Sequence, residues 1–158
     1  MAKITRSGVG VVQMRKNIQT INTQAAEVGF FDTSHYPDGT PVAYIAAIQE
    51  FGSGPIPPRP FMRDTITKRS RYWVRTLEAG AKEVLAGRLT ASQMLDGVGK
   101  LAAGDVQTTI SQLTSPALKD STTYARAHRK KKPRNTSIKP LVDTGVLFAS
   151  VDSKVVPR

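Results

Sequence analysis

Residues that could carry chemistry are sparse in this chain of 158 residues. It has no cysteine, which excludes a disulfide framework and a cysteine-based metal site, and its two histidines are His35 and His128. Asp32, His35 and Asp38 offer carboxylate and imidazole ligands, but they lie in loop-like sequence and lack a fourth ligand. No HExxH, Walker A or GxSxG pattern is present. We therefore expect neither a metal nor a cofactor.

The triplet Asp143, Thr144 and Gly145 has the residue types of an aspartic protease active site. That chemistry requires two carboxylates that share a proton on a strand-rich scaffold. This chain has only one such triplet, so the hypothesis of a small hydrolase rests on it alone. We expect that the protein is not an enzyme, and that Asp143 or Thr144 instead caps a short helix through residues 146–148.

A run of prolines is the most informative feature of the chain. Residues 51–60 read FGSGPIPPRP and contain Pro55, Pro57, Pro58 and Pro60 around Arg59. Proline has no backbone N–H, so this run can be neither helix interior nor central strand. It predicts a stiff, extended connector of polyproline type, which we call the strap (residues 53–60). A strap without a catalytic group suits positioning and docking.

The elements that position the strap follow from hydrophobic spacing. A short apolar helix is predicted over 42–51, ended by Gly52, and a long helix over 61–86 with Met62, Ile66, Trp73, Leu77 and Val84 on one face. Further helices are predicted over 12–24 and 91–113, and strands over 25–31 and 150–156. The predicted fold class is α+β: a small antiparallel sheet packed against a long helix and shorter helices, with the proline strap and a basic arm. We expect one domain over 1–158, with a flexible basic loop over 114–139.

Charge is concentrated in that loop. The net charge is +11, from 23 basic and 12 acidic residues. Residues 121–139, the basic arm, contain no acid but hold Arg126, Arg129, Lys130, Lys131, Lys132, Arg134 and Lys139. Clustered cations favour phosphates or acidic protein surfaces because binding releases condensed counterions. The first six of these side chains are therefore candidates for nucleic-acid or acidic-surface contact, although a solvated loop explains the same pattern.

Targeting signals are not evident. The segment MAKITRSGVGVV lacks the long apolar core of a secretory signal. No run of about 18 apolar residues occurs, so no membrane-spanning helix is predicted. We expect a protein that is made in the cytoplasm and has no membrane partner.

Three short motifs together resemble one protein family. VAYIAAIQEFG, then IPPRPFMR, then a long helix with a tryptophan, and finally KPLVDTGVLFAS follow one another over roughly residues 40–80 and 138–156. In this order they resemble the tail-completion or head-tail joining (neck) proteins of long-tailed bacteriophages, of the lambda-like minor tail protein Z type. The region 87–137 carries no part of the resemblance.

The resemblance implies an assembly role without catalysis. Proteins of this family form rings, commonly sixfold, that complete the tail and join it to the head connector. This implies a homo-oligomer, a hexameric ring as is common in the family, whose neighbours are tail-terminator, tail-tube and head-connector proteins, with DNA as a candidate occupant of the lumen. It implies location in the virion neck after assembly in the host cytoplasm. The residues carried over as candidate interface positions are Glu50, Phe51, Pro57, Pro58, Arg59, Phe61, Asp143 and Thr144.

The chemistry of individual residues adds two expectations about the strap. Phe51 and Phe61 are predicted to bury their rings at the two ends of the strap, each contributing roughly 2–3 kcal/mol. Arg59 is predicted to reach a carboxylate, either Glu50 of its own chain or one on a neighbour.

The alternative function is a basic nucleic-acid-binding protein that uses the arm. A stable ring would favour the neck role, and a monomer with salt-sensitive DNA binding would favour the alternative.

Overall fold

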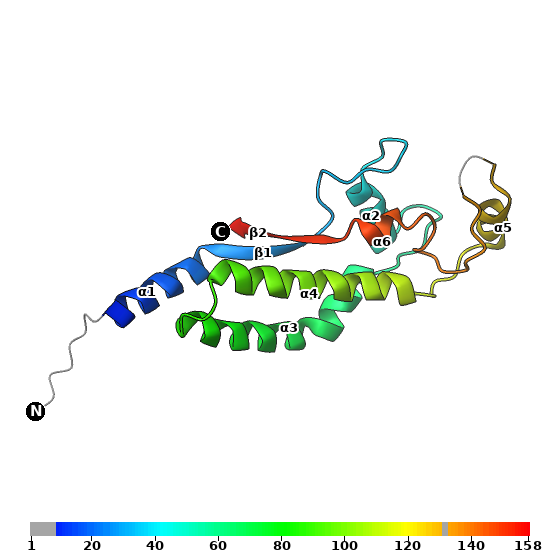
Figure 1. Cartoon of the computed structure of the whole chain (residues 1–158). Coiled ribbons are helices and arrows are strands. Elements are labelled where there is room, and N and C mark those ends of the chain that lie inside the picture. Colours follow the sequence, from blue (N-terminus) through cyan, green and yellow to red (C-terminus); the bar gives the residue numbers. More distant parts are fainter. Residues whose placement is uncertain (1–8, 131–132) are drawn as a thin grey trace, which may run out of the picture. The chain divides into compact units, whose positions relative to one another are not determined.

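The computed structural model describes residues 9–130 and 133–158. Within these residues the chain forms six helices and one two-stranded antiparallel sheet (Figure 1). Two compact units can be distinguished, each built from separate pieces of the chain. Unit 1 comprises residues 1–28, 71–102 and 153–158, and unit 2 comprises 29–70 and 103–152. We describe each unit by itself.

Unit 1 is organised around a small apolar cluster. It contains helix α1 (Val9–Asn22), most of strands β1 (Gln24–Gly29) and β2 (Asp152–Pro157), and parts of the two long helices α3 (Phe61–Leu85) and α4 (Ala91–Gln112). The buried residues of the cluster are Val84, Ala91, Met94 and Leu95, and the partly buried residues packed on it include Ile21, Leu77, Ala26 and Val155. Helices and strands thus share one core, because apolar positions recur at helical spacing in the former and on one face of the latter.

Close approach within unit 1 requires a small residue on α4. A Cβ atom on Gly99 would lie 3.0 Å from the Cβ of Ser153 and 3.5 Å from that of Ala26. Glycine therefore allows α4 to lie directly against both strands. Gly97 has open space around it. Of these two helical glycines, only Gly99 is required by packing.

Unit 2 carries the strap and the basic arm. It contains helices α2 (Val42–Phe51), α5 (Asp120–His128) and α6 (Val146–Ala149), with the first part of α3 and the last part of α4. Helix α2 contacts α6. The fully or nearly fully buried side chains of the unit are Val42, Ala46, Phe61, Thr65, Val106, Ile110, Leu141 and Leu147. They form the base on which the strap and the arm are held.

The predicted fold class is confirmed: the protein is α+β, with a long helix packed against a small antiparallel sheet. The predicted single domain over 1–158 stays a prediction. Helices α3 and α4 each contribute residues to both units. None of the helices in the described part of the chain is long and apolar enough to cross a bilayer.

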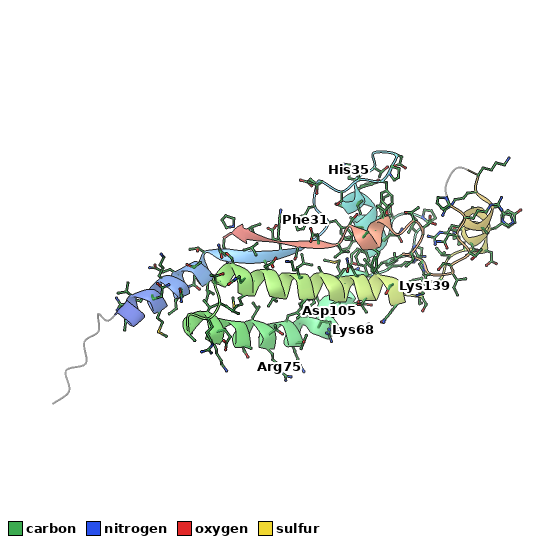
Figure 2. All side chains as sticks on the ribbon, viewed as in Figure 1. Phe31, His35, Lys68, Arg75, Asp105 and Lys139 are labelled. Carbon is green, nitrogen blue, oxygen red and sulfur yellow. The ribbon has the colours of Figure 1, made fainter. Side chains whose placement is uncertain are left out.

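Two details of the long helix differ from the predictions. Ile66 is half exposed, whereas the neighbouring Thr65 is fully buried. The Thr65 hydroxyl lies 2.7 Å from the Phe61 carbonyl and 2.6 Å from the Thr109 hydroxyl, and these partners offset the cost of burying a polar group. Trp73 is only partly buried, whereas Arg75 is exposed as expected and points away from the helix (Figure 2).

The loop predicted over 114–139 contains a helix, α5. Its sequence, DSTTYARAH, has no apolar stripe, and none of its residues is buried. Hydrophobic spacing therefore could not reveal it.

Candidate functional site

Glu50, at the end of α2, holds the start of α3. Its carboxylate accepts hydrogen bonds from the backbone N–H groups of Met62 (2.9 Å) and Arg63 (3.1 Å). These are donors of the first turn of α3 that have no partner inside the helix. A negative charge at this position also interacts favourably with the helix dipole. Glu50 is only 5% exposed, so one buried carboxylate fixes the angle at which α3 leaves the strap.

Arg63 completes this junction from the outside. Its Nε donates to the Glu50 carboxylate (2.9 Å) and a terminal nitrogen donates to the Glu50 carbonyl (2.7 Å). Its guanidinium lies 5.1 Å from the centre of the Phe51 ring, in cation–π geometry. Phe51 is 67% exposed, so the prediction that it buries its ring is wrong. The ring instead covers a charged group on the surface.

The strap begins with a tight turn. Ser53 and Ile56 exchange two backbone hydrogen bonds (3.1 and 3.0 Å), residues 57–60 form neither helix nor strand, and the Phe61 N–H donates to the Arg59 carbonyl (2.8 Å) where α3 begins. Gly52 makes the turn possible: its φ is +79°, and a Cβ atom there would lie 2.9 Å from the Ile56 carbonyl oxygen and 3.0 Å from the nitrogen of Pro58. Glycine is required both by backbone conformation and by space.

Arg59 fastens the strap to two other parts of unit 2. Its backbone N–H donates to the Gln49 carbonyl (2.6 Å). Its guanidinium donates to Gln49 Oε1 (3.0 Å) and to the carbonyl oxygens of Pro116 (3.0 Å) and Ala117 (3.2 Å). The side chain is 4% exposed. Burial lowers the pKa of Arg59 from its ordinary value, and the positive charge of Arg126 lowers it further.

The expected pairing of Arg59 with Glu50 is therefore wrong. Arg63, and not Arg59, pairs with that carboxylate. Arg59 instead donates to oxygen atoms of Gln49, Pro116 and Ala117, and its pairing with a carboxylate on a neighbouring chain stays a prediction. Its function in the subunit is to tie the strap to the segment that follows α4.

Phe61 anchors the other end of the strap, as predicted. Its side chain is fully buried, and the Phe30 ring packs edge-on against it with centroids 6.0 Å apart. Pro57 is partly buried and Pro58 is exposed. The strap therefore connects α2 to α3 and is fastened within unit 2 by Arg59 and Phe61.

Asp143 organises a second junction, between the basic arm and α6. Its carboxylate accepts two hydrogen bonds from the Arg129 guanidinium (2.9 and 2.8 Å), and Arg126 Nε lies 3.8 Å away. Asn135 donates to the Asp143 carbonyl (2.9 Å) and to that of Val142 (3.0 Å). Partial burial acts to raise the pKa of Asp143, but the hydrogen bonds from Arg129 and Asn135 and the charges of both arginines outweigh it. The pKa lies below its ordinary value.

The predicted capping role of the triplet is wrong. Gly145, with φ +80°, is the residue that precedes α6, and no side chain caps the helix. Thr144 is exposed. Asp143 is used instead as the anchor for the arm, because its two arginine partners lie in and just after α5.

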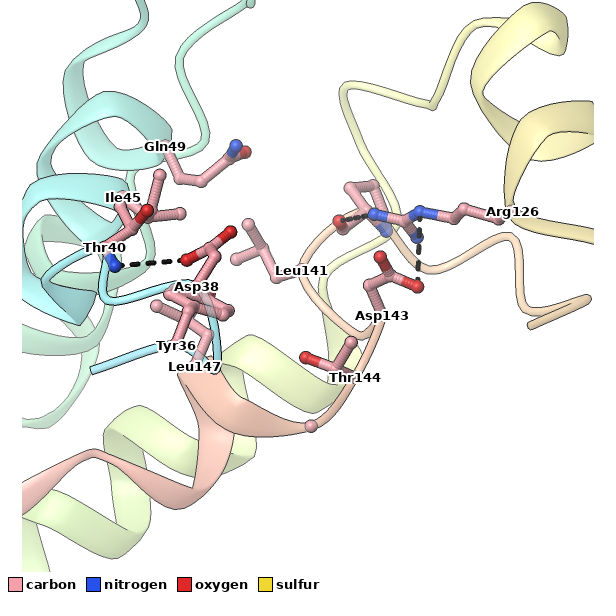
Figure 3. A pocket seen from close by; sticks show the side chains of 12 residues that line it. Tyr36, Asp38, Thr40, Ile45, Gln49, Arg126, Leu141, Asp143, Thr144 and Leu147 are labelled. Carbon is pink, nitrogen blue, oxygen red and sulfur yellow. Dashed lines mark hydrogen bonds and ion pairs between the residues drawn. The ribbon is translucent and has the colours of Figure 1, made fainter. Parts of the chain in front are cut away.

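A cavity of about 260 Å³ opens beside this junction (Figure 3). Arg126 and Asp143 lie on one side of it, and Tyr36, Asp38 and Gln49 lie on the other. Burial raises the pKa of the Tyr36 hydroxyl, and the carboxylates of Asp143 and Asp38 raise it further.

The cations of the arm separate into two groups. Arg126 donates to the carbonyl oxygens of Lys139 (3.1 Å) and Pro140 (3.0 Å), and Arg129 is engaged with Asp143. These two arginines attach the arm to Pro140 and Asp143, which follow it in the sequence. Lys130 and Arg134 are exposed, whereas Lys131 and Lys132 lie outside the described residues. The side chain of Lys139 is exposed as well (Figure 2).

Sequence reasoning missed three residues that build these junctions: Arg63, Gln49 and Asn135. Arg63 was detectable in principle, because it follows a proline strap at a helix start, where an arginine can pair with a preceding acid. Gln49 and Asn135 are uncharged, and their partners lie 10 and 8 residues away across turns. No sequence pattern signals such contacts.

In the described part of the chain, no group of three or more histidine, aspartate or glutamate side chains is arranged to hold a metal ion. Asp32, His35 and Asp38 thus do not come together as ligands. Comparison of the chain with models of protein families, with curated proteins and with solved structures found no significant match.

Proposed function

We propose that the protein is a structural subunit of a bacteriophage neck or head-proximal tail end. In this role it forms a ring, sixfold as is common in the family that the motifs resemble, that completes the tail and joins it to the head connector. It acts by docking and not by catalysis. Its neighbours would be tail-terminator, tail-tube and head-connector proteins, and it would be part of the virion.

One observation carries the proposal. Of the three motifs that resemble the neck proteins, the first two follow closely on one another and the third lies far from them in the sequence, yet all three belong to unit 2. The end of α2 supports the strap through Glu50 and Gln49, α2 contacts α6, and Gln49, Leu141 and Asp143 line the same cavity. A set of motifs that folds into one rigid surface is what a docking subunit needs, because preorganised contacts lose little entropy on assembly.

The internal bonding of the strap also supports a docking role. Its backbone is restricted by prolines and fixed by Gly52, Arg59 and Phe61. The three charged or large polar groups nearest to it, Glu50, Arg59 and Gln49, are satisfied within the subunit. The strap is therefore held in one conformation by contacts within the chain, unlike a flexible loop that becomes ordered only when a substrate binds.

The test is particle assembly without this protein. Phage particles that are made without the chain should accumulate as separate filled heads and tails, and addition of the purified chain should join them, as counted by electron microscopy. An antibody against the chain should label the neck. Normal joined particles in the absence of the chain would contradict the proposal.

The nucleic-acid-binding alternative has less support. Two of its six predicted contact residues, Arg126 and Arg129, are engaged with acceptors of the same subunit. A monomer that binds duplex DNA with a steep dependence on salt would favour it nonetheless.

A further inference from the structure

We propose that the last turn of α5 is a binding site for single-stranded nucleic acid, in which an unpaired base stacks on an exposed pair of rings. The rings are those of Tyr124 and His128. The exposed cations Lys130 and Arg134 contact the phosphates on either side of that base. We call these four residues the stacking site. It goes beyond the neck role proposed above and needs no ring of copies, because all four residues belong to unit 2 of one chain.

The two rings form a flat surface with one open side. Tyr124 and His128 are four residues apart on α5, and their ring centroids lie 4.1 Å apart with an angle of 22° between the planes. One face of the tyrosine ring is therefore covered by the imidazole. Tyr124 is nevertheless 67% exposed, so its other face is open to solvent. A nucleobase is planar and aromatic as well, and it can stack on this open face.

The pair of rings is ordered before any ligand binds. Nδ1 of His128 lies 2.9 Å from the Tyr124 carbonyl oxygen. A carbonyl oxygen can only accept, so this nitrogen carries a hydrogen atom and donates it. The bond ties the imidazole to the backbone of α5, and the imidazole in turn supports the tyrosine ring. A surface that is already ordered loses little entropy when a ligand binds to it.

Packing within the subunit does not require an aromatic residue at position 124. None of the residues of α5 is buried, so the helix adds no side chain to the apolar core of unit 2. Helix α5 is held through polar contacts: Arg126 donates to the Pro140 carbonyl (3.0 Å), and Arg129 donates to the Asp143 carboxylate (2.9 and 2.8 Å). A ring pair at this spacing can also stabilise a helix by itself, so a test must separate that role from binding.

Two cations lie next to the rings. Lys130 follows His128 by two residues, and its side chain is exposed, as is that of Arg134. The backbone N–H of Asn135 donates to the Arg126 carbonyl (3.1 Å), so the chain returns after α5 and brings Arg134 beside the last turn of the helix. Neither Lys130 nor Arg134 forms an ion pair with another residue in the described part of the chain. Their charges are available to phosphates.

The combination of rings and cations selects the class of ligand. In a duplex the bases stack on one another, and an external ring finds no open base. A single strand offers bare base faces and phosphates together. An acidic protein surface would meet the cations, but its carboxylates would be repelled by the negative face of the tyrosine ring. Single-stranded nucleic acid is therefore the ligand that uses all four residues.

The experiment separates base stacking from phosphate binding. The full chain is titrated with two labelled probes of about 12 nucleotides, an oligothymidylate and an abasic strand with the same phosphates, and fluorescence anisotropy reports binding. Tyr124→Leu removes the aromatic face but keeps a long apolar side chain on the helix, so the NMR signals of the α5 backbone should remain helical. Its affinity for the oligothymidylate should fall about five- to a hundredfold, and its affinity for the abasic strand should not change.

Further variants test the parts of the stacking site. Tyr124→Phe keeps the ring and should keep the affinity. Tyr44→Leu is the matched control, because Tyr44 is 61% exposed on α2, a helix without a basic residue, and it should bind both probes as the unmodified chain does. Lys130→Gln combined with Arg134→Gln should weaken the binding of both probes. It should also lower the slope of log K against log salt concentration by about 1.4, since each phosphate contact on a single strand contributes about 0.7.

Each other outcome overturns the inference. Equal affinity of the unmodified chain for the two probes would show that no base is stacked, and equal losses in Tyr124→Leu and Tyr44→Leu would place the contact elsewhere. A polyglutamate peptide that displaces the oligothymidylate, and whose own affinity falls in Tyr124→Leu, would assign the site to an acidic protein. Failure to bind the oligothymidylate at low salt also contradicts it. None of these results bears on the proposed neck role, which the joining of heads to tails tests separately.

Discussion

The strap and the arm are both held by a carboxylate and arginines, but in different ways. At the strap, Glu50 is buried and accepts hydrogen bonds from two backbone N–H groups as well as from Arg63. At the arm, the side chain of Asp143 is 33% exposed. Its carboxylate accepts hydrogen bonds from the side chains of Arg129 and Asn135, and the side chain of Arg126 lies nearby. A buried carboxylate bonded to backbone resists salt, whereas partly exposed ion pairs are weakened by it. We therefore expect the contacts of the strap to be less sensitive to salt than those of the arm.

The largest difference should appear between one aromatic residue of each region. Phe61→Ala removes a fully buried ring and is expected to lower the free energy of unfolding by about 3–5 kcal/mol. Tyr124→Ala in the arm removes an exposed ring and is expected to change it by no more than about 0.5 kcal/mol. Urea unfolding of the two variants measures both values. Equal losses would show that the arm is part of the core of the subunit.

The two carboxylates give the next test. Glu50→Gln keeps the shape of the side chain but removes its charge and sets an amide against backbone donors, at an expected cost of about 2–3 kcal/mol. Asp143→Asn should cost about 1 kcal/mol or less, because exposed ion pairs contribute little. Chemical denaturation at low and high salt is the measurement. A larger loss for Asp143→Asn would reverse the comparison between the strap and the arm.

Two glycines with positive φ differ both in backbone conformation and in crowding. Gly52 (φ +79°, ψ 161°) lies in a region that is essentially restricted to glycine, whereas Gly145 (φ +80°, ψ −10°) lies in the left-handed helical region, and of the two only Gly52 has atoms within 4 Å of a Cβ position. Gly145→Ala should therefore cost about 1–2 kcal/mol, from conformation alone. Gly52→Ala should cost more, since the Ile56 carbonyl and Pro58 must also shift. Thermal unfolding of both variants tests this, and equal costs would show that the strap yields easily.

The smallest expected effect is a change in the arm at acidic pH. The pKa of Asp143 is lowered in the folded chain, so its ion pairs stabilise the arm above the ordinary pKa of about 4. This stabilisation is lost as the pH falls through the lower, folded value. The side-chain amide signals of Asn135 in NMR spectra should then shift, while signals from the strap stay in place. Asp143→Asn is the control and should show no such transition. A simultaneous change in the strap would contradict the independence of the two junctions.

Much of the fold could be predicted because it depends on the local spacing of apolar residues and on the glycines and prolines that end helices. The bounds of α2 and the start of α3 follow from Gly52 and the prolines, and the structure places them at the predicted residues. Helix α5 could not be predicted, because it has no buried residue and is held by long-range contacts of Arg126 and Arg129.

Two of the wrong predictions at the site have one cause. Phe51 was expected to bury its ring because phenylalanine is apolar, and Arg59 was expected to pair with Glu50 or another carboxylate because arginine is charged. In the structure Arg63 lies over the exposed Phe51 ring, and three carbonyl or amide oxygens accept hydrogen bonds from the buried Arg59 guanidinium. Whether these two side chains are buried depends on the partner groups that the fold brings to them. The sequence alone does not show those partners.

The pairing of β1 with β2 has a consequence for biosynthesis. The backbone N–H of Arg158 donates to the Thr23 carbonyl (2.8 Å) beside the sheet, so β1 pairs with a strand that lies far from it in the sequence. On the ribosome, β1 emerges early and its hydrogen-bonding edge stays open until β2 has been made. An open strand edge in a nascent chain is a site for aggregation. Release of β2 is thus the event that completes unit 1, and closure of so long a loop makes this pairing a slow step in folding.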